Sequence, residues 1–146
     1  MSGDELENFT PYLLNRIMAR YNMGVEQALK AAGVSVPQMR TLTVLDKRGP
    51  CTINELSVLT VINQSTLSRT LDALEDLDCV RRETDANDSR IRRIHLTENG
   101  RELCTKTWPK MKGMEETMLA SLTQEQRQEF NSFLKCILHD IRCHEL

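Results

Sequence analysis

The 146-residue sequence lacks the segments that would place a protein in or across a membrane. No apolar run reaches 18 residues, about the length that a membrane-spanning helix needs. The N-terminus, Met-Ser-Gly-Asp-Glu-Leu-Glu, is acidic and contains no hydrophobic segment of the secretory type. Together these absences predict a cytoplasmic protein that makes no membrane contact.

Catalytic motifs are absent as well. The chain has no Gly-rich phosphate loop and no Gly-x-Ser-x-Gly turn, and its three histidines have no suggestive spacing from an acid and a nucleophile. We therefore expect the protein not to be an enzyme and to carry no cofactor.

The five cysteines are an odd number, and no two of them have the Cys-x-x-Cys spacing of a zinc site. Thiols and imidazoles do gather near the C-terminus, at Cys136, His139, Cys143 and His144. Cysteines seven residues apart on a helix are separated by about 10 Å, too far to share one ion without a second chain. We predict reduced thiols and no metal site, and a redox role for any of the cysteines stays open.

Composition and charge fit a single globular domain. Hydrophobic residues make up 40% of the sequence and charged residues 27%, and the length allows a core of its own. The net charge of −2 argues against a non-specific nucleic-acid coat, which would be strongly basic. Charge is uneven, however, because residues 81–95 carry +2 and residues 61–80 carry −3. A sequence-specific DNA-binding protein is compatible with this distribution.

The segment 64–77 predicts an amphipathic helix with Asn63 as its N-cap. Its leucines at i, i+4, i+7 and i+10 form one apolar stripe, made of Leu67, Leu71, Leu74 and Leu77. The candidates for DNA contact are the polar residues of its first turns, namely Gln64, Ser65, Thr66, Ser68 and Arg69. No bulky apolar residue blocks that face, which suits it to the major groove. The alternative is an ordinary amphipathic helix with a solvated polar face.

The surrounding residues predict a winged helix-turn-helix. Thr52-Ile53-Asn54-Glu55 has the form of a capping box, which predicts a short helix before the one at 64–77. Segments 80–84 and 91–96 predict two strands joined by the turn-forming residues 85–90. Five arginines stand in this hairpin against three acidic residues. Such a basic wing would supply phosphate or minor-groove contacts that the helix cannot reach.

The sequence in this region resembles the MarR family of bacterial transcriptional regulators. The resemblance is carried by Leu74-Glu75, Val80-Arg81-Arg82, Asp85, Asp88-Ser89-Arg90 and Ile94-His95-Leu96-Thr97-Glu98-Asn99-Gly100. Length and flanking helices also fit, so it covers essentially the whole chain. The chain departs from the family at Asp78-Cys79, where a glycine and an apolar residue are usual.

The resemblance implies roles for the residues of the wing. Arg90 would lie at the wing tip and enter the minor groove with Asp88 braced against it, since a narrow minor groove concentrates negative potential. Independently of the resemblance, Arg81, Arg92 and Arg93 alternate along the hairpin. We expect one or two of them to contact phosphates, with Arg92 as our candidate, and the remainder to be surface charges or to form intramolecular salt bridges.

Helical segments are predicted on both sides of this unit. The first spans residues 10–33 with Thr10 as its N-cap, and a second runs from Ser35 to Arg48. After the wing, a helix begins near residue 98, which Pro109 should kink or divide. A capping box at residues 123–126 opens the last helix. Its apolar residues are expected to face inward: Phe130, Phe133, Leu134, Ile137, Leu138 and Ile141.

The fold class is therefore mainly α with a small β-hairpin wing, in one domain spanning residues 1–146. Residues 37–97 would form the DNA-binding lobe. The resemblance implies that residues 9–33 and 98–146 form a dimerisation region in which helices of two chains intertwine. A twofold dimer would set two recognition helices about 34 Å apart, on an inverted repeat.

We expect a transcriptional regulator, of the repressor type usual in this family, that binds double-stranded DNA as a homodimer. A small-molecule effector could bind beside Tyr21, Trp108 and Met111, although aromatic and methionine residues at helical spacing also form plain core. The alternative function is a winged-helix protein–protein interaction module. Such a module should expose apolar anchors on its recognition helix, and this sequence places polar residues there.

Overall fold

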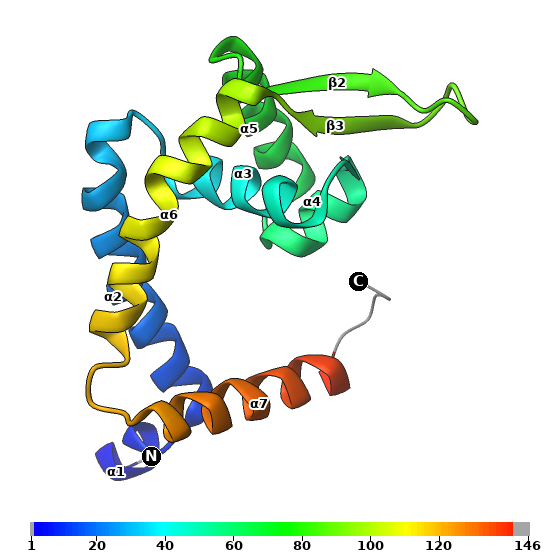
Figure 1. Cartoon of the computed structure of the whole chain (residues 1–146). Helices are drawn as coiled ribbons and strands as arrows, with labels where there is room; N and C mark the ends of the chain where they lie inside the picture. Colours follow the sequence, from blue (N-terminus) through cyan, green and yellow to red (C-terminus); the bar gives the residue numbers. More distant parts are fainter. Residues whose placement is uncertain (1, 142–146) are drawn as a thin grey trace.

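Figure 1 shows the computed structural model, which describes residues 2–141. The helices are α1 (Gly3–Glu7), α2 (Thr10–Leu29), α3 (Val36–Arg48), α4 (Ile53–Thr60), α5 (Gln64–Asp76), α6 (Glu98–Met118) and α7 (Gln124–Ile141). The strands are β1 (Cys51–Thr52), β2 (Val80–Thr84) and β3 (Arg92–Leu96). The predicted class, mainly helical with a winged helix-turn-helix, is confirmed.

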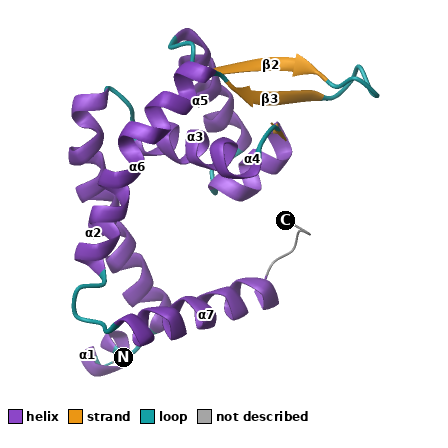
Figure 2. Ribbon diagram, in the orientation of Figure 1, coloured by secondary structure: helices purple, strands orange, loops and turns teal. Residues whose placement is uncertain are grey.

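One lobe of the molecule consists of α3, α4, α5 and an antiparallel sheet of order β1-β3-β2 (Figure 2). Three leucines of the predicted stripe, Leu67, Leu71 and Leu74, are completely buried in its core. They pack with Leu42 of α3 and Leu56 of α4, which are also completely buried. Each such side chain stabilises the fold by about 1.5–3 kcal/mol relative to an exposed one, so this core fixes how α5 is presented.

Local capping signals begin the helices where the sequence predicts. Ser35 and Gln38 form a reciprocal capping box at the start of α3, and Thr52 and Glu55 do the same for α4. The Asn63 side chain accepts a hydrogen bond from the backbone N–H of Thr66 at 2.9 Å, which caps α5 as expected. These bonds satisfy backbone donors that the helices themselves leave unpaired.

Several predicted boundaries are wrong. Phe9, not Thr10, is the N-cap of α2, and the helix gives way to a 3-10 turn at Lys30–Ala32. The hairpin gains a third strand, since Cys51 of β1 pairs with Ile94 of β3. Leu77 lies beyond the end of α5 and is 48% exposed, so it leaves the apolar stripe. The short helix α1 was not predicted, although Ser2 and Glu5 have the spacing of a capping box and form one.

The turn from α5 into β2 explains the departure from the family pattern. Asp78 has a positive φ of 56°, a left-handed conformation in which glycine is unstrained and aspartate is one of the better-tolerated alternatives. Cys79 follows it and is 2% exposed, so it fills the apolar position as a small hydrophobic side chain. Asp78-Cys79 therefore preserves the turn that a glycine and an apolar residue would form.

A column made of α2 and α6 leads away from the lobe (Figure 1). The two helices approach closely at Gly24, where an added Cβ would lie 2.3 Å from the Met114 Cε atom. Pro109 lies inside α6 without dividing it, because the helix is continuous from Glu98 to Met118. The column thus joins the lobe to the C-terminal helix.

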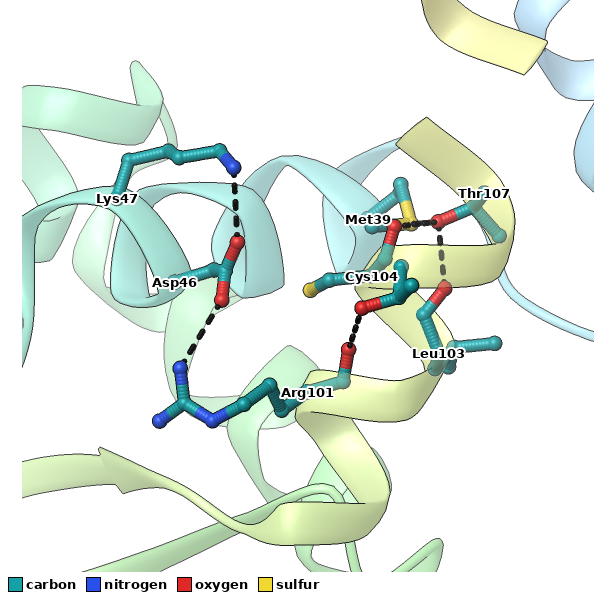
Figure 3. A network of polar contacts seen from close by, with 8 residues as sticks. Met39, Asp46, Lys47, Arg101, Leu103, Cys104 and Thr107 are labelled. Carbon is teal, nitrogen blue, oxygen red and sulfur yellow. Dashed lines mark hydrogen bonds and ion pairs between the residues drawn. The ribbon is translucent and has the colours of Figure 1, made fainter. Parts of the chain in front are cut away.

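Figure 3 shows the polar contacts that join α3 of the lobe to α6 of the column. The Asp46 carboxylate lies 3.1 Å from Lys47 Nζ and accepts a hydrogen bond from Arg101 Nη1 at 3.3 Å. Lys47 Nζ also lies 5.0 Å from the centroid of the Trp108 ring, in cation–π geometry. Deeper in the joint, the buried Thr107 hydroxyl of α6 lies 3.0 Å from the Met39 Sδ atom of α3, and it also lies 2.8 Å from the Leu103 carbonyl of its own helix.

The last helix, α7, extends from the foot of the column with no buried residue (Figure 1). The capping box predicted at Thr123 and Gln126 is present. Four of the apolar residues expected to face inward are at least half exposed: Phe133, Ile137, Leu138 and Ile141. Within residues 2–141, no helix is both long and apolar enough to span a bilayer.

Candidate nucleic-acid interface

The polar face of α5 is accessible, whereas its opposite face is buried in the lobe. Gln64, Ser65 and Arg69 are exposed, and Thr66 and Ser68 are half-buried beside them. The Ser65 hydroxyl donates to Asn63 Oδ1 at 2.8 Å, so the N-cap also orients the first turn of this face. The structure thus brings the five predicted groove residues together on one surface, where hydrogen-bonding groups could reach base edges.

Asn54 joins this surface although the sequence gives no signal for it. It lies in the first turn of α4, and its Oδ1 accepts a hydrogen bond from Gln64 Nε2 at 2.5 Å. Two exposed amides from successive helices are therefore linked across the turn of the helix-turn-helix. Such a contact depends on how α4 and α5 cross, which helical periodicity does not determine.

The turn of the wing is organised by Asp85. Its carboxylate accepts hydrogen bonds from Arg93 Nε at 2.7 Å and from the backbone N–H groups of Asn87 and Asp88, at 2.8 and 3.2 Å. The bond from Arg93, followed by those from the backbone, lowers the pKa of Asp85 below its ordinary value. The wing turn is thus held by a carboxylate that stays ionised at neutral pH.

Arg90 stands at the wing tip with its side chain 87% exposed. Asp88 accepts hydrogen bonds from the Arg90 backbone N–H at 3.0 Å, from Nε at 3.1 Å and from Nη2 at 3.0 Å. These bonds raise the pKa of Arg90 and lower that of Asp88. A guanidinium has five N–H donors, and three of those of Arg90 form no hydrogen bond with any residue that the structure describes.

The other wing arginines differ in their partners. Arg82 bridges two acids of α5, with Nη1 at 2.6 Å from Glu75 and Nη2 at 2.9 Å from Asp72. Arg81 pairs with Glu83 at 2.6 Å. Arg92 is exposed and forms no ion pair with the residues that the structure describes.

Arg90 and Arg92 also border a hollow of about 440 Å³ that reaches Thr52, Ile53 and Asn54, so the wing and α4 form one continuous surface.

Of the three ligand-binding candidates, Tyr21 lines a hollow in the structure. The hollow has a volume of about 490 Å³ and lies between α2 and α6, and its other walls include Arg16, Arg20 and Met114. Burial, more than the nearby Glu115 carboxylate, raises the pKa of the Tyr21 hydroxyl. Trp108 lies beside Lys47, and Met111 packs, as Tyr21 does, against the buried core that α2 and α6 share with the lobe. Neither Trp108 nor Met111 is among the residues lining the hollow.

The cysteines offer no metal cluster among residues 2–141. Cys51, Cys79 and Cys104 are buried, and Cys136 is exposed on α7. Cys143 and His144 lie outside the described residues.

Comparisons with known proteins agree with this architecture. A sequence model of the MarR family matches residues 32–91. The chain is 40% identical to a MarR family transcriptional regulator from Silicibacter pomeroyi; the alignment covers 97% of this chain and 95% of the other, with a TM-score of 0.88. It is 25% identical to the HTH-type transcriptional repressor IacR of Pseudomonas putida, over 92% of this chain and 81% of that protein.

A third relative was crystallised with a small molecule. The Mycobacterium tuberculosis MarR family protein in complex with salicylic acid is 27% identical to this chain. Coverage is 87% of this chain and 94% of the other, and the TM-score is 0.72.

Proposed function

This chain belongs to the MarR family of transcriptional regulators, and from that premise we propose that it represses transcription by binding an inverted-repeat operator as a homodimer. The observation that carries the proposal is the wing tip. Arg90 is held by Asp88, yet three of its N–H donors form no hydrogen bond within residues 2–141, on a side chain that is 87% exposed. A fixed cation of this kind suits the negative potential of a narrow minor groove.

The recognition helix complements the wing. Residues Gln64 to Arg69 would enter the major groove, while Arg90 would reach the adjacent minor groove and Arg92 a phosphate. The helix face offers hydrogen-bonding groups, which would read the bases. The wing offers positive charge, which would position the protein on the DNA backbone. Repression is the direction we propose because similar chains, among them the Pseudomonas putida protein, are transcriptional repressors.

Dimerisation is supported by the surface that one chain leaves uncovered. The accessible area is 10180 Å² for a mass of 16.8 kDa, whereas a globular monomer of this mass exposes about 7,700 Å². The apolar residues of α7 supply much of the surface that a partner could cover, together with Leu13 and Ile17 of α2, which are 42% and 41% exposed. An excess of this size is comparable with the area that an obligate homodimer buries.

An effector could act at the hollow between α2 and α6. Its lining combines apolar side chains with Arg16, Arg20 and the Tyr21 hydroxyl. These groups suit a small ligand with an anionic group on an apolar body. The relative that binds salicylic acid supports this class of ligand. A ligand between these two helices would release DNA if it favoured a lobe spacing that does not match the operator.

The proposal is tested by selecting bound duplexes from a random DNA pool, with wild type, Arg90→Ala and Lys112→Ala at one fixed salt concentration. We expect the wild type to enrich an inverted repeat whose half-sites are about 10 base pairs apart. Arg90→Ala should weaken binding to that repeat by about tenfold or more and leave thermal unfolding unchanged. Lys112→Ala removes one positive charge from α6, where it pairs with Glu115, and should bind as wild type does.

Two results would contradict the proposal. Equal affinity of wild type and Arg90→Ala for the operator would show that the wing tip does not contribute to DNA binding. Failure to enrich any sequence over a range of salt concentrations and with candidate anions absent would favour the protein-binding alternative, in which the exposed Val61 at the turn between α4 and α5 would be the apolar anchor.

A further inference from the structure

The hydrogen bond between Gln64 and Asn54 restricts a side chain at the N-terminal end of the proposed groove face. Gln64 is the first residue of α5 and Asn54 lies in the first turn of α4. Both residues are exposed, so burial does not force the contact, and the Gln64 Nε2 atom donates to Asn54 Oδ1. The bond therefore selects one orientation of a glutamine that would otherwise sample several rotamers.

The selected orientation leaves a particular pattern of free groups on Gln64. A glutamine amide has one acceptor oxygen and two N–H donors. Asn54 accepts one of the donors, which leaves Oε1 and the second N–H. An acceptor beside a donor is the pattern that pairs with N6–H and N7 of adenine in the major groove.

The neighbouring side chains do not present this pattern. The Ser65 hydroxyl already donates a hydrogen bond to Asn63. A hydroxyl group can also both donate and accept, so it does not distinguish between bases. Arg69 offers donors only, which suits guanine. Gln64 is thus the group on this face whose remaining donor and acceptor favour adenine.

We propose that Gln64 reads an adenine in each half-site of the operator and that Asn54 is the positioning residue that fixes its amide for this contact. The inference rests on the proposed DNA-binding function and deepens it, because it assigns a base preference to one pair of residues. Without Asn54, the Gln64 side chain could rotate or present its amide the other way round. Either change would remove the preference for adenine over other bases and leave the phosphate contacts intact.

The test measures base preference rather than affinity alone. Once an operator has been selected, its positions are substituted singly with the four base pairs, and dissociation constants are measured for each protein variant at one salt concentration. For wild type we expect one position per half-site at which adenine is favoured by about 5- to 150-fold, the range for a bidentate contact. In Asn54→Ala this preference should fall to about twofold, with the preferences at other positions unchanged.

Three further variants separate positioning from structure. Asn54→Asp keeps an acceptor for the Gln64 N–H group, so the adenine preference should survive even though the added negative charge weakens binding to every sequence. Gln64→Glu has acceptors only and should shift the preference at the same position to cytosine, whose N4 group is a donor. Asn15→Ala, the same change on α2, should leave the base profile untouched.

The outcomes distinguish this inference from the function on which it rests. If wild type selects no operator, the proposed function itself fails. If an operator is selected but Asn54→Ala keeps the wild-type profile, or Asn54→Asp loses the adenine preference as completely as Asn54→Ala does, the positioning role is wrong. A uniform loss of affinity in Asn54→Ala, without any change in base preference, would likewise reduce Asn54 to a structural residue.

Discussion

Single residues show where the helix-turn-helix tolerates strain. Within residues 2–141, Val61 and Asp78 are the non-glycine residues with positive φ, at 57° and 56°. Aspartate is tolerated in this conformation, whereas a β-branched residue there is an outlier. Val61 is also 84% exposed, so its side chain gains little from packing. The turn between α4 and α5 therefore stores strain that its sequence could release.

Replacing Val61 with glycine should stabilise the protein. Relief of the left-handed strain is worth about 1–2 kcal/mol, and the greater freedom of glycine in the unfolded chain offsets about 0.5–1 kcal/mol of it. We expect the free energy of unfolding in urea to rise by about 0.5–1 kcal/mol. Val61→Ala removes the same exposed side chain but keeps the strained backbone, so its stability should stay within about 0.5 kcal/mol of wild type. A destabilised glycine variant would contradict this account.

Asp85 gives the wing a defined dependence on pH. Its pKa lies below the ordinary 3.8 because Arg93 and two backbone N–H groups bond its ionised form. A carboxyl with a lowered pKa stabilises the folded state fully above its unfolded value and loses that effect as pH falls through the folded value. Carboxyl NMR titration should therefore give a midpoint below 3.8 for Asp85, and Arg93→Ala should move it upward. A wild-type midpoint at or above 3.8 would exclude the hydrogen-bonded turn.

Among whole elements, α6 shows why the end of the family motif contains a glycine. Thr97 caps the helix by accepting a hydrogen bond from the Gly100 backbone N–H at 3.0 Å, and its hydroxyl donates to the Asp78 carbonyl at 2.6 Å. A Cβ at Gly100 would lie 2.2 Å from the Cys79 carbonyl oxygen. The start of α6 is thus pressed against the turn that carries the wing.

Two glycines of α6 should respond oppositely to alanine. Gly100→Ala places a methyl group against backbone, and overpacking of this kind costs about 1–3 kcal/mol. Gly113 has open space around its Cα, so Gly113→Ala should stabilise the same helix by up to about 1 kcal/mol. Chemical denaturation of both variants provides the measurement, and each is the control for the other. Equal effects in the two variants would show that the contact with Cys79 does not restrain α6.

Sequence signals predicted these elements well where the cause is local. The capping boxes at Ser35 and Thr52 need only residues three apart, and the wing strands alternate around a short turn. The strand β1 was missed because two residues pair with a partner more than 40 positions away. Asn54 was missed for the same reason, since its contact depends on the crossing of two helices. Pro109 leaves α6 undivided, which the proline alone did not predict.

For the whole molecule, the exposed face of α7 is the main departure from a self-contained domain. Phe133, Ile137 and Ile141 repeat every four residues and are 64%, 50% and 72% exposed. Apolar periodicity predicts one face of a helix but does not say which chain covers it. The inward orientation expected for these residues is not satisfied within one chain, and a second copy is the covering that we propose.

Adding charge to this face should separate the dimer. Ile137→Asp buries a carboxylate on each side of a twofold interface, and we expect its dissociation constant in sedimentation equilibrium to rise at least 30-fold, as for an interface hot spot. Operator affinity should fall with it because the two lobes are no longer linked. Asn131→Asp adds the same charge at an exposed polar position of α7 and is the control. A dimer of unchanged strength in Ile137→Asp would place the interface elsewhere.

The double ion pair of Arg82 also bears on the thermodynamics of binding. It joins β2 to Asp72 and Glu75 of α5, and so links the wing to the proposed recognition helix in the absence of DNA. A hairpin that becomes ordered only on contact loses conformational entropy at that moment, which weakens binding. In the function that we propose, the entropy of ordering the wing is lost during folding, so the lobe would bind the duplex as a preorganised unit.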